Sequence, residues 1–156
     1  MAEKDTAGVL MPPPIAWLLA VVAGVELNQL MPWSYLPMAA LPRIVIGVAV
    51  FAVAVLLAAW SIRTMRLAGT RYETSKPTSV IVAEGPYRFT RNPIYTAMMI
   101  GEAGLAVALD NAWLLAMLLP FYVVLRWGII AREEAYLERK FGAPYLAYKQ
   151  SVRRWL

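Results

Sequence analysis

The residues IVIGVAVFAVAVLLAAW, Ile44–Trp60, indicate the class of protein to which this chain belongs. No charged side chain occurs among them, and they lie within a longer apolar segment from Pro42 to about Met65. A helix needs about 20 mostly apolar residues to cross the hydrocarbon core of a bilayer. The segment therefore predicts a helix that spans a membrane.

The composition of the whole chain agrees with this prediction. Hydrophobic residues make up 60% of the 156 residues and charged residues 16%, and the mean hydropathy is +0.55. A soluble domain is about half apolar and about a quarter charged. The length is that of a single domain, residues 1–156. In so apolar a chain, the formal charge of +5 indicates contact with anionic membrane lipids, and no nucleic-acid partner is expected.

Three other apolar segments accompany the first. They cover residues 15–30, 93–109 and 112–131. We therefore predict an all-α integral membrane protein with about four transmembrane helices, two of them within residues 14–65 and two in a helical hairpin over residues 93–131. The hairpin is expected to turn at Asp110 and Asn111, which separate its two apolar segments.

Polar segments flank these helices. Residues 1–13 are polar, end near three prolines, and predict a short flexible arm without a cleavable signal peptide. In residues 132–156, apolar side chains continue at helical spacing as far as Phe141. The fourth helix is therefore expected to extend beyond the membrane and to end at Gly142, with Pro144 as a further stop signal.

The end of the sequence predicts a second, shorter helix. Four residues fall on one of its faces: Tyr145, Tyr148, Val152 and Trp155. Basic side chains, including Lys149 and Arg153, lie beside this stripe. The pattern is typical of an amphipathic helix at a membrane surface.

The basic residues predict how the helices are oriented. They gather in the loop 66–92 and in residues 132–156, whereas the other two connections hold only Arg43 and Asp110 as charged groups. By the positive-inside rule, both termini and the 66–92 loop are expected to be cytoplasmic. The predicted location is the inner membrane of a bacterium or archaeon.

Histidine and cysteine are both absent. Their absence excludes disulfides, thiol nucleophiles, imidazole acid–base catalysis and metal sites that use these two ligands, and no metal is expected. Any chemistry must therefore rely on carboxylates, arginines, tyrosines, backbone groups or a bound cofactor.

The turn that leads into the third apolar segment is a candidate ligand site. It reads GPYRFTRNPIY, Gly85–Tyr95. Asn92 is a good N-cap and Pro93 suits the first helical position, so free N–H groups and a positive helix end would face the turn. With Arg88 and Arg91 beside them, these groups predict a site for an anion or a carboxylate-bearing cofactor. The alternative is an ordinary loop whose arginines contact lipid phosphates.

Two neighbouring glutamates follow the fourth apolar segment. Glu134 shares a helix face with apolar neighbours, so it is expected to pack inward and to need a cationic partner, for which Arg91 is the candidate. Glu133 should point about 100° away, toward Arg126. The alternative is that both glutamates face solvent.

Two further acids, Glu26 and Glu102, lie within predicted spans, where an ionisable group is a functional candidate. Glu102 comes seven residues after Tyr95 and would lie on nearly the same face, about 10 Å deeper. We predict that Glu102 lines a substrate cavity, whereas Glu26 has a structural role.

Taken together, these motifs resemble the isoprenylcysteine carboxyl methyltransferase family of small integral-membrane methyltransferases, which is similar to the phospholipid N-methyltransferases. The resemblance covers roughly residues 70–156. It rests on the order of these residues: Pro77, Ile81, Val82, Gly85–Arg88, Arg91–Pro93, Tyr95, Glu133, Glu134, Leu137, Phe141, Gly142, Tyr145 and Tyr148. Asn92 departs from the histidine that eukaryotic members carry, and asparagine cannot take up a proton.

The resemblance implies S-adenosylmethionine as the methyl donor, S-adenosylhomocysteine as the product, and a lipid or lipophilic acceptor. We hypothesise that this acceptor enters from the bilayer near Glu102. It implies cofactor contacts from the loop, the start of the third helix and the tail: Ile81, Val82, Gly85, Pro86, Tyr87, Arg91, Asn92, Pro93, Tyr95, Glu133 and Glu134. Arg91 and Glu134 are the implied catalytic residues.

Other functions stay open at this point. One is a non-enzymatic membrane protein that binds anionic lipids through its basic loop. Another is a sterol-type reductase with NADPH as cofactor, which shares the architecture of the C-terminal part but usually has extra helices. A third is a small transporter with Glu26 and Glu102 as proton sites, although inverted repeats are absent.

Overall fold

The computed structural model describes residues 5–156, and all regular elements in this range are helices. The longer ones are α1 (Pro13–Leu30), α2 (Ala40–Leu67), α3 (Pro93–Leu109), α4 (Ala112–Val123), α5 (Ala131–Phe141) and α6 (Ala143–Ser151). A short 3₁₀ helix, η1 (Gly85–Arg88), precedes α3, and a π-helical segment, η2 (Val124–Ile130), joins α4 to α5. The prediction of an all-α chain is confirmed for the described residues.

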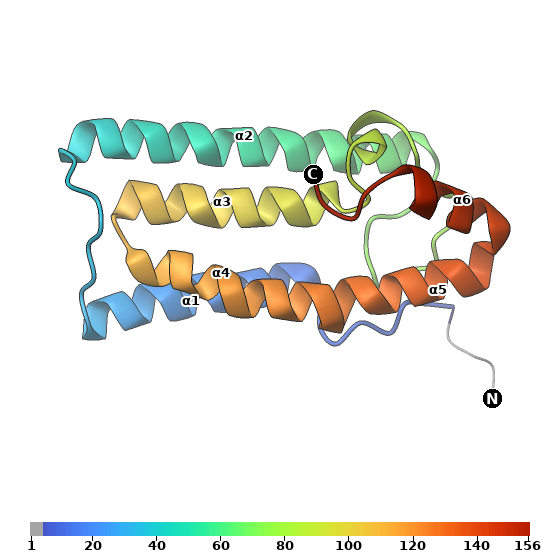
Figure 1. Ribbon diagram of the computed structural model, residues 1–156, viewed down its shortest axis with the longest axis horizontal. Helices are drawn as coiled ribbons and strands as arrows, with labels where there is room; N and C mark the ends of the chain where they lie inside the picture. Colours follow the sequence, from blue (N-terminus) through green and yellow to red (C-terminus); the bar gives the residue numbers. More distant parts are fainter. Residues whose placement is uncertain (1–4) are drawn as a thin grey trace.

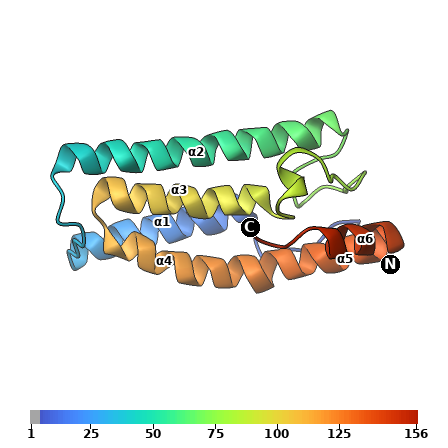
Figure 2. The same ribbon diagram turned by 45° about the horizontal axis from the view of Figure 1, so that its top comes forward.

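The helices form an elongated bundle (Figure 1). α2 and α3 pack against each other along their lengths, and α1 packs against α4. The α3–α4 turn and the α1–α2 connection lie together at one end, which we call the hairpin end (Figures 1 and 2). The loop 68–92, α5 and α6 lie at the opposite end, which we call the loop end (Figures 1 and 2).

Three helices are long and apolar enough to cross a membrane. They are α1 with 18 residues, α2 with 28 residues, and the continuous helix Ala112–Phe141 with 30 residues. Large apolar side chains of α1 and α2, such as Leu19 and Leu56, are exposed on the outside of the bundle, as lipid contact requires. α3 is also apolar but has only 17 residues. These helices indicate insertion into a membrane, and the exact number of spans stays a prediction.

Glycines bring α2 and α3 into backbone contact. A Cβ atom on Gly47 would lie 2.4 Å from the main-chain nitrogen of Ala108 and 2.6 Å from the carbonyl oxygen of Gly104. A Cβ atom on Gly104 would lie 2.8 Å from the nitrogen of Phe51. Small residues allow membrane helices to approach this closely, and the contact fixes the last turns of α3 against the first turns of α2.

The predicted hairpin turns at Asp110 and Asn111. Asp110 adopts the left-handed backbone conformation, with a φ of 50°, and ends α3. The Asn111 side chain accepts hydrogen bonds from the main-chain N–H groups of Trp113 and Leu114, which caps α4. Its amide also donates to the carbonyl of Gly24 at 3.1 Å and so fastens α1 to the turn.

Asp110 also holds the connection between α1 and α2. Its Oδ1 atom accepts hydrogen bonds from the main-chain N–H groups of Tyr35 and Leu36, both at 3.0 Å. Its Oδ2 atom forms a 2.8 Å ion pair with Arg43 at the start of α2. One carboxylate therefore ties together three segments at the hairpin end.

We expect Asp110→Ala to lower the Tm of the detergent-solubilised protein by about 5 °C or more, because the Tyr35 and Leu36 N–H groups lose their acceptor. The matched control is Glu26→Ala, since Glu26 is an exposed acid on α1. Thermal unfolding followed by circular dichroism measures both. Equal Tm values for the two variants would contradict a structural role of Asp110.

The tail differs from the prediction after α6. The fourth helix continues through η2 into α5 and stops before Gly142, whose φ is 60°. α6 ends at Ser151, and Val152 is extended, so Trp155 does not lie on the predicted helical stripe. Trp155 instead packs against the ring of Tyr122, with 5.6 Å between centroids. The predicted short helix after Gly142 is present as α6, but the prediction that it extends to Trp155 is wrong.

Part of the predicted N-terminal arm lies along the fold, and residues 1–4 of that arm lie outside the described residues. The main-chain N–H of Leu10 donates to the carbonyl of Gly128 in η2. The Asp5 carboxylate accepts hydrogen bonds from Tyr136 Oη at 2.8 Å and from Lys140 Nζ at 2.7 Å. The arm thus follows η2 and α5 toward the loop end.

Candidate functional site

A cavity of about 140 Å³ lies at the loop end, where the loop 68–92 and the start of α3 meet α5 and α6. Nine of the predicted site residues line it: Ile81, Val82, Tyr87, Arg91, Asn92, Pro93, Tyr95, Glu133 and Glu134. The other lining residues include Ala7, Tyr72, Thr78, Tyr136, Leu137, Tyr145 and Tyr148. The loop, the start of α3 and α5 are far apart in the sequence but meet at one cavity, as the resemblance to membrane methyltransferases implied.

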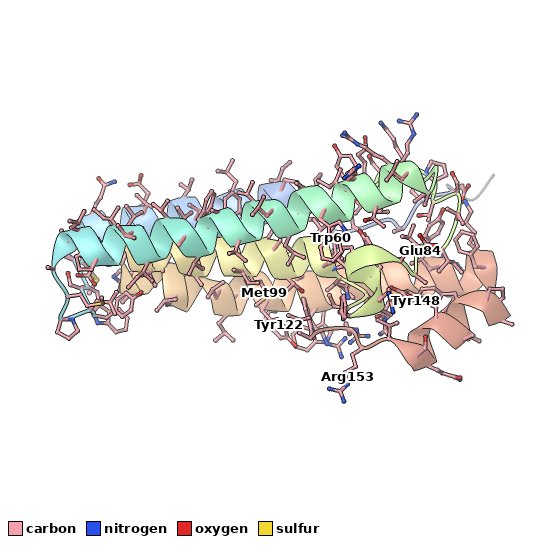
Figure 3. The ribbon with its side chains drawn as sticks, turned by 90° about the horizontal axis from the view of Figure 1, so that it is seen from above. Trp60, Glu84, Met99, Tyr122, Tyr148 and Arg153 are labelled. Carbon is pink, nitrogen blue, oxygen red and sulfur yellow. The ribbon has the colours of Figure 1, made fainter. Side chains whose placement is uncertain are left out.

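Tyrosine rings form much of the cavity wall. Tyr87 comes from η1, Tyr95 from α3, and Tyr145 and Tyr148 from α6. The Tyr148 hydroxyl donates to the carbonyl of Tyr87 at 2.9 Å, which joins α6 to η1 (Figure 3). Burial raises the pKa of Tyr148 to about 12 and the pKa values of Tyr87 and Tyr145 further. The wall therefore consists of neutral aromatic side chains at physiological pH.

Arg91 is buried in the structure and does not extend toward lipid. Its Nη2 atom donates to Glu134 Oε1 at 2.8 Å, and its Nη1 atom donates to the carbonyls of Lys149 and Val152 at 2.7 and 2.8 Å. Its Nε atom is buried and has no hydrogen-bond partner. The predicted pairing of Arg91 with Glu134 is present, and one Arg91 donor still points to no acceptor.

Both oxygens of Glu134 accept charged hydrogen bonds. Oε1 accepts from Arg91 and from Arg154 Nε, and Oε2 accepts from Arg154 Nη2. Burial alone would raise the pKa of Glu134, but the hydrogen bonds from Arg154 and Arg91 outweigh it and lower the pKa below its ordinary value. Glu134 therefore stays ionised and is occupied by two guanidinium groups.

Glu133 faces the cavity and not Arg126, so its predicted direction is wrong. Its Oε1 atom accepts a hydrogen bond from Tyr95 Oη at 2.7 Å. Glu133 follows the apolar residues 112–131, which by themselves suffice for a membrane crossing. Burial raises its pKa to about 7; the Tyr95 hydrogen bond opposes this and the nearby Glu134 charge adds to it. Glu133 is thus a half-buried carboxyl in the cavity wall that can change its charge near neutral pH.

Asn92 lies at the N-cap position of α3, but its side chain does not cap the helix. The side-chain amide instead donates to the carbonyl of Arg154 at 2.9 Å. The prediction of a capping asparagine is therefore wrong, and Asn92 connects the start of α3 to the tail.

Gly85, Pro86 and Arg88 do not line the cavity. Gly85 has a φ of 54°, and a Cβ atom there would lie 2.8 Å from Thr64 Oγ1 on α2. Gly85 and the buried Pro86 therefore shape η1 against α2, and Arg88 is exposed. Only Arg91 of the two predicted arginines enters the site.

The two intramembrane acids lie in different surroundings. Glu102 on α3 is fully buried, its two carboxyl oxygens have no hydrogen-bond partner, and it does not line the cavity at the loop end. Glu26 is exposed on α1. The structure does not place Glu102 together with the other predicted site residues, so its part in substrate binding stays a proposal.

Among the residues at the site that the sequence did not predict are Tyr136, which lines the cavity, and Arg154, which holds Glu134. Tyr136 lines the cavity, and its hydroxyl accepts from the N–H of Thr78 at 3.2 Å and donates to Asp5. Its position three residues after Glu133, on the same helix face, was a usable signal. Arg154 had no such signal, because it lies in an extended segment whose path local spacing does not reveal.

The sequence matches a known protein family. A family model described as phospholipid methyltransferase matches residues 42–144, more than half of the chain. The chain belongs to the phospholipid methyltransferase family. This membership confirms the resemblance to small membrane methyltransferases and implies methyltransferase activity. The matched residues include η1, the start of α3 and both cavity glutamates, whereas α6 lies mostly beyond them.

Other comparisons add little on function to the phospholipid methyltransferase match. A Haemophilus influenzae protein described only as uncharacterized is 56% identical over 45 residues, which cover 29% of this chain and 68% of that protein. No solved structure matches the chain.

Proposed function

We propose that this phospholipid methyltransferase family member transfers a methyl group from S-adenosylmethionine to a lipid or lipophilic acceptor. The observation that carries the proposal is the cavity at the loop end, which combines tyrosine faces with the Glu133 carboxyl in a membrane-helix bundle. We further propose that this end faces the cytoplasm, because most basic residues lie there.

The side chains of the cavity suit the proposed cofactor. Aromatic faces attract cations, and Tyr87, Tyr95 and Tyr148 present such faces to a sulfonium. Glu133 can accept hydrogen bonds from an ammonium or hydroxyl group, because only one hydrogen bond, from Tyr95, occupies it. The free Arg91 Nε can donate to a carboxylate. Each of these groups matches one chemical feature of S-adenosylmethionine.

The residues that line the cavity would bind and align the two reactants, and none of them would form a covalent bond with the methyl group. When bound, S-adenosylmethionine supplies a methyl group on a positive sulfur, which a nucleophile displaces in line. Holding the two reactants in this alignment and excluding water lowers the barrier. An amine acceptor must also lose a proton, and Glu133 is the cavity carboxyl that can take it, since Arg91 and Arg154 occupy Glu134 and Lys76 pairs with Glu73.

The acceptor would reach this cavity from the bilayer. Glu102 is the buried polar group on the membrane side, on the same helix as Tyr95. An unpartnered acid at this depth is costly, which supports a role in receiving a polar group of the acceptor. In this proposal Glu134 acts by assembling the cavity, whereas Glu133 and Arg91 Nε contact the ligand.

Calorimetric titration of the detergent-purified protein tests the proposal directly. We expect S-adenosylhomocysteine to bind with micromolar affinity and NADPH not to bind. Binding of NADPH alone would point to a reductase and overturn the proposal. Binding of neither ligand, with affinity for anionic lipids retained, would favour a lipid-binding protein without enzymatic activity.

The titration of Glu133 gives a second test. Ionised Glu133 should favour the cationic donor, so the affinity for S-adenosylmethionine should rise up to about tenfold from pH 6 to pH 8, as Glu133 loses its proton near pH 7. In Glu133→Gln the rise in affinity should be smaller, because only the ionisable groups of S-adenosylmethionine itself still titrate. Calorimetry at both pH values measures it, and an unchanged rise in the variant would exclude Glu133 from contact with the donor.

A further inference from the structure

The residues after α6 run back along the turn that precedes α3. The main-chain N–H of Arg91 donates to the carbonyl of Arg153 at 2.9 Å. Thr90 Oγ1 and Asn92 Nδ2 both donate to the carbonyl of Arg154, also at 2.9 Å. Three consecutive residues before α3 therefore fasten the backbone of the tail.

The next residue anchors the tail a second time. Trp155 packs on Tyr122 and joins the apolar cluster formed by α1, α3 and α4. Arg154 thus lies between hydrogen-bonded carbonyls and a packed indole ring. A backbone that is fixed on both sides directs the Arg154 side chain with little loss of entropy on ligand binding.

From this position two nitrogens of Arg154 form hydrogen bonds with the Glu134 carboxylate. Its Nε atom donates to Oε1 at 2.9 Å, and its Nη2 atom donates to Oε2. Such two-pronged pairs fix orientation as well as charge. Arg91 occupies the remaining position on Oε1. Without Arg154, Glu134 could rotate and draw Arg91 away from the carbonyls of Lys149 and Val152.

We infer that Arg154 is a positioning residue of the cofactor site: by fixing both oxygens of Glu134, it holds Arg91 in place and leaves two neighbouring polar groups, Arg91 Nε and Glu133, available to the ligand. The inference rests on the proposed function and extends it to a residue outside the part of the chain that matches the family. The residues after α6 do not line the cavity themselves, so their removal changes affinity through Glu134.

The test uses S-adenosylhomocysteine titrated into the full-length protein and three variants. Arg154→Gln should weaken binding about 10- to 100-fold, because two charge-assisted hydrogen bonds are lost. Arg154→Lys keeps the charge without the two-pronged geometry and should fall between Arg154→Gln and wild type. Arg153→Gln is the matched control, since Arg153 points away from the bundle (Figure 3) and should bind as wild type does.

A pH profile separates positioning from simple loss of structure. The titratable or charged groups around Glu134 are Arg91, Arg154, Glu133 and Tyr145. When the charge of Arg154 is lost, burial is opposed only by Arg91 and the pKa of Glu134 rises, so the affinity of Arg154→Gln should fall more steeply than that of wild type as the pH is lowered. Arg154→Lys should keep the wild-type slope.

The outcomes distinguish this inference from the proposed function. If wild type does not bind S-adenosylhomocysteine, the proposed function fails first. If wild type binds and Arg154→Gln binds within twofold of it, or if Arg153→Gln loses as much, the inference is overturned. Weaker binding with an unchanged pH slope would also overturn it. Should Arg154→Gln fail to fold, Arg154→Lys still tests the inference, because it should bind S-adenosylhomocysteine more weakly than both wild type and Arg153→Gln, and equal binding in all three would overturn it.

Discussion

Replacement of Arg91 by alanine should weaken S-adenosylhomocysteine binding by at least about 100-fold, because breaking a buried ion pair is among the more costly single changes. The variant loses the pair with Glu134 and the two bonds to the carbonyls of Lys149 and Val152. The bond from Arg91 to Glu134 and the bonds from Arg91 to the end of α6 would both be lost, whereas the tail would keep its bonds to Thr90 and Asn92. Calorimetry of the purified variant measures the effect.

The matched control for this prediction is Arg63→Ala. Arg63 is an exposed arginine near the end of α2 at the same end of the bundle. A basic surface that serves only to bind lipid would treat the two arginines alike. Similar losses of vesicle binding in both variants, with S-adenosylhomocysteine affinity intact in Arg91→Ala, would contradict the site described above.

Gly47→Ala should prevent α2 and α3 from packing and destabilise the fold by at least about 3 kcal/mol, since overpacking against rigid backbone exceeds the usual cost of an extra methyl group. The added Cβ atom would meet the backbone of Ala108 and Gly104 at 2.4–2.6 Å, where no side chain can rotate aside. We expect low yield of monodisperse protein and a large drop in Tm.

Gly101→Ala is the control on the same pair of helices. A Cβ atom on Gly101 would find its nearest neighbours, Ala54 and Phe51, at 3.5–3.6 Å, which is ordinary contact. Alanine also has a helix propensity about 1 kcal/mol better than that of glycine. Gly101→Ala should therefore be neutral or slightly stabilising, and equal losses in both variants would refute the close approach at Gly47.

The features that the sequence predicted correctly depend on burial and charge. The segment Ile44–Trp60 has no charged side chain, so it avoids water, and in a helix all its backbone polar groups can still form hydrogen bonds. Glu134 lies on an apolar helix face, so it needed a cationic partner, and Arg91 is that partner. Both inferences follow from the cost of removing a polar group from water, which does not depend on the details of the fold.

The features that the sequence did not predict depend on helix phase and chain path. The direction of Glu133 was counted at 3.6 residues per turn, but the π-helical segment Val124–Ile130 has wider turns and shifts everything that follows it. Pro120 lies in the preceding turns, yet nothing in the residues themselves specifies the π geometry. The path of residues 152–156 follows contacts with Thr90, Asn92 and Tyr122 that are distant in sequence.

The two ends of the bundle are fastened in different ways, and this has a mechanical consequence. At the hairpin end, hydrogen bonds and an ion pair of Asp110 and Asn111 connect α1, the start of α2 and the α3–α4 turn. Any tilt of the α2–α3 pair against the α1–α4 pair therefore pivots there. α3 has 17 residues and is about 25 Å long, so a tilt of about 5° moves its other end by about 2 Å. A small tilt about the hairpin end would therefore change the width of the cavity at the loop end, unless the bonds of Thr90 and Asn92 to the tail resist it.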